Sequence, residues 1–114
     1  MSQRLAIARA IVHEPSVLLL DEPFTGLDEG SAERLSSQLV ELRAGGRTLV
    51  VVTHDPRRAV ELSDRALILD RGEIFARPAR APDKGESDYS VETLRALLLA
   101  AADRDRRKDR EDAA

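Results

Sequence analysis

The chain has 114 residues, of which 42% are hydrophobic and 3% aromatic, with a net charge of −3 and no cysteine. This length suits one small domain or part of a larger one, and the hydrophobic share is typical of a globular protein. Few aromatic residues and scattered positive charges argue against nucleic acid as a partner, and the lack of cysteine excludes disulfides and thiolate metal sites.

No segment of the sequence has the apolar length of a membrane span. The longest uninterrupted apolar run is Ala96 to Ala102, whereas a spanning helix needs roughly 20 residues. Arg4 and Arg9 interrupt the apolar residues near the N-terminus, so no signal-peptide core is present. We therefore expect a cytoplasmic chain that reaches the membrane only through a partner.

The first two thirds of the chain alternate between helical and strand patterns. Apolar spacing and turn residues predict helices over 2–12, 29–44 and 56–62, the last of them short. Between and after the helices they predict buried strands over 17–20 and 48–53, a strand over 65–70 and a hairpin strand over 73–76. Asp28 is the expected N-cap of the second helix. The unbroken apolar runs predict strands buried on both faces. This order predicts an α/β fold with a mainly parallel sheet flanked by helices.

The pattern changes after Arg77. Residues 77–90 contain prolines, charges and a glycine, which predicts a linker. Ser90 is a suitable cap for a helix over 91–102, and we expect the charged tail from Asp103 to Ala114 to fray. The expected organisation is therefore a domain portion over 1–76, a linker over 77–90, and a C-terminal helix with a charged tail over 91–114.

Acidic residues and a histidine follow two of the predicted strands. Asp21-Glu22 follows the first buried strand and His54-Asp55 follows the second. In open parallel sheets, ligands bind at the carboxyl ends of the strands, and Mg²⁺ is usually held by one or two carboxylates plus phosphate oxygens. Two adjacent acids at a strand end can simply be solvated, so Asp21-Glu22 alone does not predict a metal site. The other motifs of the sequence favour one.

Four motifs occur in one order: QRLAIARA, LLLDEP, TGLD and VTHD, at residues 3–10, 18–23, 25–28 and 52–55. Together they resemble the ATP-binding-cassette (ABC) family over residues 1 to about 76. The resemblance implies the C-terminal part of a P-loop NTPase domain of the ABC type, beginning at the end of the signature motif. It identifies LLLDEP with the Walker B strand, TGLD with the D-loop and THD with the switch-histidine motif.

The resemblance also implies a role for each matching residue. Asp21 would hold Mg²⁺, directly or through water, and Glu22 would polarise the water that attacks the γ-phosphate of ATP. His54 would contact that phosphate and help position the water, and Asp28 would lie at the dimer interface and couple the two nucleotide sites. Glu22 and His54 are thus the predicted catalytic residues, and Asp21, Asp28 and His54 the predicted residues for binding ATP and Mg²⁺.

The phosphate-binding half of such a site does not occur in the sequence. No stretch matches G-x-x-x-x-G-K-[ST], whose amides and lysine cradle the phosphates. Met1 falls where the signature motif L-S-G-G-Q has its last residue, which predicts an internal methionine of a longer protein. We expect this chain alone to hydrolyse no ATP.

The family resemblance predicts the ATP-binding subunit of a transporter, with a second ATPase subunit and a transmembrane permease as partners. The methionine and DEPFTGLD resemble export ATPases, including the haem exporter of cytochrome c maturation and multidrug-type exporters. The alternative is a non-catalytic fragment, stranded or regulatory, that only associates with a cassette or a permease.

Overall fold

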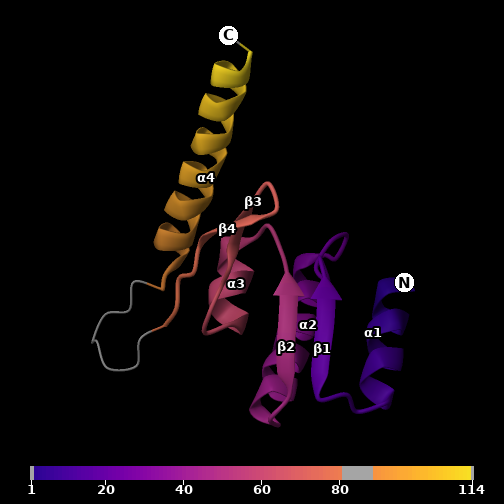
Figure 1. Ribbon diagram of the computed structural model, residues 1–114. Helices are drawn as coiled ribbons and strands as arrows, with labels where there is room; N and C mark the ends of the chain where they lie inside the picture. The colour runs from indigo at the N-terminus through magenta and orange to yellow at the C-terminus, as the bar shows by residue number, and fades with distance from the viewer. Residues whose placement is uncertain (1, 81–88, 114) are drawn as a thin grey trace. The chain divides into compact units, whose positions relative to one another are not determined.

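The computed structural model describes residues 2–80 and 89–113 (Figure 1). The chain divides into two compact units, Met1–Arg58 and Ala59–Ala114. None of the helices in the described ranges is long and apolar enough to span a membrane.

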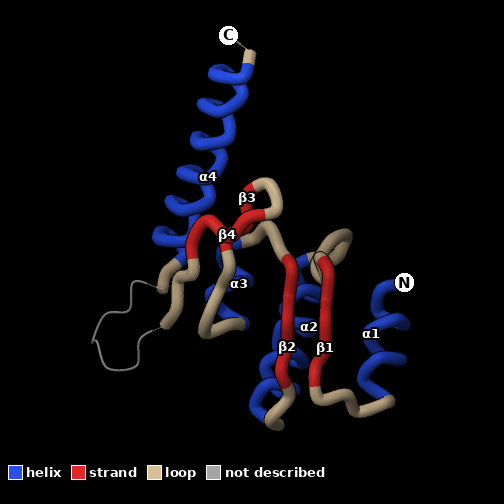
Figure 2. Tube along the Cα trace, viewed as in Figure 1, coloured by secondary structure: helices blue, strands red, loops and turns tan. Residues whose placement is uncertain are grey.

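The first unit is built on a parallel pair of strands with helices before and after the first strand (Figure 2). The strands are in register from Val17 opposite Thr48 to Asp21 opposite Val52. The second helix packs against the second strand. The elements of this unit are α1 (Ser2–Val12), β1 (Val17–Asp21), α2 (Glu29–Ala44) and β2 (Thr48–Val52).

The predicted cap and apolar stripe define α2. Asp28 has extended backbone angles, and its carboxylate accepts a hydrogen bond from the Ser31 amide at 2.7 Å, which satisfies one of the free N–H groups of the first turn. Leu35 and Leu39 are buried, Leu39 completely. Gly46, with a φ of +91°, turns the chain out of the helix. The predicted helix and its cap are confirmed.

The expectation that both faces of the strands are buried is wrong for this chain. Leu18 and Leu20 are buried, but the alternate residues Val17 and Leu19 are 59% and 70% exposed. Successive side chains of a strand point to opposite faces of the sheet. The unbroken apolar run therefore places hydrophobic side chains on both faces, whereas this chain buries only one of them.

The second unit is an antiparallel hairpin packed with a long helix. The third predicted strand begins at Ile68 rather than at Arg65, and it pairs with the strand over 73–76 as the predicted hairpin. Within the described residues this hairpin forms a sheet of its own and does not extend the parallel sheet, contrary to what the strand order predicts. Arg65 forms only an isolated bridge with Ala79. A tight turn at Arg71-Gly72, where both residues have positive φ, folds the chain straight back into this hairpin. The elements here are β3 (Ile68–Asp70), β4 (Glu73–Ala76) and α4 (Val91–Asp112), preceded by α3 (Pro56–Leu62), which begins in the first unit.

The apolar stripe of α4 packs into the core of the second unit. Leu94 and Ala101 are buried together with Ile68 and Tyr89. The Tyr89 hydroxyl lies 2.5 Å from the Ser63 hydroxyl, so the buried aromatic ring keeps a partner for its polar end.

The expectation that the charged tail frays is wrong, because α4 continues to Asp112. Arg71 of the hairpin turn forms ion pairs with Asp105 and Asp109, and Arg107 pairs with Asp103 one turn earlier along the helix. Most of the predicted linker, residues 81–88, lies outside the described residues.

The exposed apolar face of β1 and β2 predicts that the 114-residue chain associates with itself in dilute solution. Apolar strands that present an open face or edge are sites of aggregation. Size-exclusion chromatography with light scattering should show species larger than a monomer. Leu19→Lys, on the exposed face, should raise the monomer fraction, whereas the same change at buried Leu18 should unfold the unit. A monomeric wild-type chain with a sharp cooperative melt would contradict this prediction.

Candidate functional site

The parallel register brings the carboxyl ends of β1 and β2 side by side. Asp21, the last residue of β1, lies opposite Val52, the last residue of β2. The pairing continues one residue further, because the Glu22 amide donates a hydrogen bond to the Val52 carbonyl at 2.8 Å. The two segments that carry the predicted site residues therefore leave the sheet at the same edge.

Glu22 and His54 meet at this edge. His54 Nε2 lies 3.2 Å from Glu22 Oε1. The His54 side chain is 97% exposed, whereas that of Glu22 is 30% exposed. The pair thus places an acceptor and a ring nitrogen together, with the histidine open to solvent and the glutamate partly withdrawn from it.

The backbone at Glu22 has an unusual conformation. Its φ is +47°, in the left-handed region that costs a non-glycine residue roughly 1 kcal/mol or more. The chain turns sharply there, with the Thr25 amide donating to the Glu22 carbonyl at 3.3 Å, and the next residue, Pro23, is fully buried. Strained residues of this kind persist where their surroundings hold them, and they concentrate at functional sites.

The loop that follows β2 is ordered by its own short hydrogen bonds. The Asp55 amide donates to the Thr53 hydroxyl at 3.1 Å, and the Arg57 amide donates to the Asp55 carboxylate at 3.0 Å. Asp55 therefore organises the first turn of α3, and this arrangement fixes the backbone on which His54 stands.

Asp21 and Asp28 occupy the two ends of the connection from β1 to α2. Asp21 is exposed at the end of the strand, and Asp28 is the N-cap of the helix. Within residues 2–80 and 89–113, no group of three or more histidine, cysteine or acidic side chains is arranged to hold a metal ion. A single carboxylate fits Mg²⁺ if phosphate oxygens and water complete its coordination, so Asp21 suits a metal that arrives with a nucleotide.

The sequence reasoning missed one charged residue beside this site, Arg58. It is 3% exposed, and arginine is almost never buried unless it is paired. Its partners Glu29 and Glu33 are one turn apart on α2. The spacing of these two acids was the available signal, but nothing in the sequence indicated which cation would lie against them.

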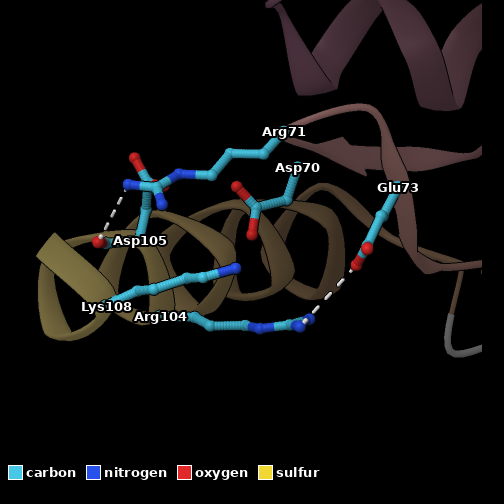
Figure 3. Close-up of a pocket in the computed structure, with 6 residues that line it drawn as sticks. All are labelled: Asp70, Arg71, Glu73, Arg104, Asp105 and Lys108. Atoms are coloured by element: carbon cyan, nitrogen blue, oxygen red, sulfur yellow. Dashed lines mark hydrogen bonds and ion pairs between the residues drawn. The ribbon is translucent and has the colours of Figure 1, made fainter. Parts of the chain in front are cut away.

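The second unit contains a small hollow between the hairpin turn and α4 (Figure 3). Its volume is about 40 Å³, enough for water but far too small for a nucleotide. Acidic and basic side chains line it, and several already pair with one another, including Arg104 with Glu73 at 3.8 Å. The ion pairs of Arg71 and Arg104 hold α4 against the hairpin at this hollow.

No protein-family model matches the chain. Among curated proteins, it is 40% identical over 111 residues to the aliphatic sulfonates import ATP-binding protein SsuB 1 of Nocardia farcinica, covering 90% of the chain and 45% of that protein. It is 42% identical over 86 residues to the macrolide export ATP-binding/permease protein MacB of Hyphomonas neptunium, covering 70% of the chain and 13% of that protein.

A solved structure is similar to the chain in both fold and sequence. It is the ATP-binding cassette MJ0796 in a dimeric post-hydrolysis state bound to ADP and Pi, with a TM-score of 0.62 and 35% identity, covering 68% of the chain and 33% of that protein. The chain spans less than half the length of each of these proteins.

The hydrogen bond from the Ser31 amide to Asp28 predicts that substitutions at Asp28 change the stability of the first turn of α2. Asp28→Ala should remove about 1 kcal/mol from the first turn of α2, whereas Asp28→Asn should keep the cap. Hydrogen exchange of the Ser31 amide should then be about fivefold faster in the alanine variant and nearly unchanged in the asparagine variant. Equal exchange in all three proteins would show that Asp28 does not cap the helix.

Proposed function

We propose that this chain, which belongs to the ATP-binding-cassette ATPase family, supplies the water-positioning part of the ATP-hydrolysis site in a transporter's complete cassette. The observation that carries the proposal is the contact between Glu22 and His54 at the carboxyl ends of two adjacent parallel strands. Ligands of open parallel sheets bind at this edge. Phosphoryl transfer depends mainly on positioning and on stabilising charge, and this pair is suited to both.

In the proposed site, Glu22 accepts a hydrogen bond from the attacking water, and His54 donates one to the γ-phosphate. The partly withdrawn carboxylate and the exposed imidazole support this division, because the histidine is open to an incoming ligand. The strained backbone at Glu22 sets the carboxylate in place before the nucleotide arrives. Such preorganisation avoids the cost of rearranging polar groups during the reaction.

ATP and Mg²⁺ are the proposed cofactors. Asp21 would hold the metal, directly or through water, at the end of β1. Bound Mg²⁺ neutralises phosphate charge in such sites. The sequence contains no phosphate-cradling G-x-x-x-x-G-K-[ST] loop, so the proposal assigns that task to another part of the complete cassette. The same feature supports the second candidate, a non-catalytic segment that only associates with a cassette or a permease.

The proposed partners are a second ATPase subunit and a transmembrane permease. The dimeric state of the similar cassette supports the first, and the combined ATP-binding/permease name of the macrolide relative supports the second. In that dimer, Asp28 would lie at the interface, at the start of α2. The similar proteins include both import and export proteins, so export stays a prediction from the sequence resemblance.

The proposal predicts that Glu22→Gln in the complete cassette slows hydrolysis while leaving nucleotide binding nearly intact. The amide keeps the size of the carboxylate but accepts a proton and polarises water less well. Loss of one preorganised group should lower kcat roughly 100- to 1000-fold, and His54→Ala should act in the same direction. Steady-state hydrolysis gives kcat, and equilibrium binding of a nucleotide gives Kd.

Light scattering with ATP supplies a second measurement, since slow hydrolysis should accumulate the ATP-bound dimer. Glu41→Gln, an exposed change on α2, is the matched control and should behave as wild type. Wild-type turnover by the Glu22→Gln variant would remove the catalytic role assigned to this strand end. Normal nucleotide binding without ATP-dependent dimerisation would remove the role assigned to the dimer.

A further inference from the structure

Arg58 lies on α3, in the segment that follows His54, and its side chain is almost completely buried. It follows His54 by four residues, and its guanidinium lies over the ring of Phe24, which follows Glu22 by two residues. We propose that Arg58 is a positioning residue that fixes Glu22 relative to His54. The inference rests on the proposed function, because its catalytic consequence assumes that this pair positions water.

Three contacts define the location of the guanidinium. Its Cζ atom is 5.2 Å from the centroid of the Phe24 ring. Its Nη1 atom is 3.4 Å from Glu33 Oε1, and its Nη2 atom is 3.6 Å from Glu29 Oε1. One side chain of α3 therefore contacts the loop after β1 and the first turns of α2.

The chemistry of these contacts suits arginine best, and a lysine could keep only the charge. A guanidinium is planar, stays charged, stacks on an aromatic face and reaches two carboxylates at once. The Arg58 side chain is 4% exposed, whereas those of Glu29 and Glu33 are 74% and 58% exposed. The acids therefore stay hydrated while the cation is covered, which limits the cost of burying charge.

The contact between Arg58 and Phe24 matters for the site because it lies next to the strained turn at Glu22. Glu22 holds a φ of +47°, a conformation that persists only where neighbouring packing enforces it. Buried Pro23 and the Phe24 ring under Arg58 provide that packing. Without Arg58, the turn can relax and move the Glu22 carboxylate away from His54, although both catalytic groups are still present.

Arg57 provides a matched comparison on the same helical turn. Its side chain is 61% exposed, and its Nη2 atom lies 3.8 Å from the same Glu29 oxygen. It shares the charge and one acidic partner of Arg58 but is not buried. A general effect of positive charge near the site would appear equally at both positions, whereas a positioning role belongs to Arg58 alone.

The test uses the complete cassette that contains this chain, with Arg58→Met, Arg58→Lys and Arg57→Met. Because a displacement of about 1 Å can cost up to about 100-fold in rate, Arg58→Met should lower kcat roughly 10- to 100-fold. The KM for ATP should stay within about twofold, since no group that contacts the nucleotide is removed. Arg58→Lys should recover part of kcat through its charge, and Arg57→Met should match wild type.

Nuclear magnetic resonance of the His54 ring provides a measurement independent of turnover. In the wild-type background, Glu22→Gln should change the His54 ring signals, because the two side chains touch. In the Arg58→Met background the same substitution should change them much less. His54→Gln identifies the ring signals of this residue.

Each outcome decides the proposal. Unchanged kcat in Arg58→Met overturns it. A fall in kcat without recovery in Arg58→Lys, together with a His54 response to Glu22→Gln as large as in wild type, also overturns it and assigns Arg58 a structural role. If wild-type hydrolysis does not depend on Glu22, the proposed function fails, and the His54 signals still decide whether Arg58 positions the pair.

Discussion

The parallel pairing of β1 with β2 is the constraint on which the site depends. Five residues of each strand are in register, and the hydrogen bond from Glu22 to Val52 extends the pairing beyond the strand end. Because both strands run in the same direction, Glu22 and His54 leave the sheet at one edge. An antiparallel pair would send these two residues to opposite ends. The chemistry of the site therefore follows from strand direction before it depends on any single side chain.

The connection from β1 to α2 is fixed at both ends by different interactions. At its start, the chain turns through the left-handed conformation of Glu22 and buries Pro23. At its end, Asp28 caps the helix. Between them, Phe24 lies under the guanidinium of Arg58. A short segment held in this way can present a carboxylate in one orientation, which is what positioning of a water molecule requires.

Features governed by local patterns were predictable, whereas those governed by distant partners were not. The α2 helix, its Asp28 cap and the hairpin strand over 73–76 follow from residues close in sequence, and all three are present. The continuation of α4 was missed because Arg71, far back in the chain, pairs with its acids. The apolar runs of the strands indicate hydrophobic side chains on both faces of the sheet, but a run alone does not show which of the two faces this chain covers itself. Motif resemblance indicated Glu22 and His54, but Arg58 matches none of the motifs, and its contacts are with Phe24 and with two acids of α2, which lie at least 25 residues away in the sequence.

The most direct measurement is a structure of the complete cassette with Mg²⁺ and a non-hydrolysable ATP analogue. The account predicts that the γ-phosphate lies at the carboxyl ends of β1 and β2, with Asp21 on the metal side, His54 within hydrogen-bonding distance of a phosphate oxygen, and a water molecule between Glu22 and the phosphorus. A nucleotide bound with its γ-phosphate away from this edge, or with Glu22 turned out of reach of any such water, would contradict the central claim.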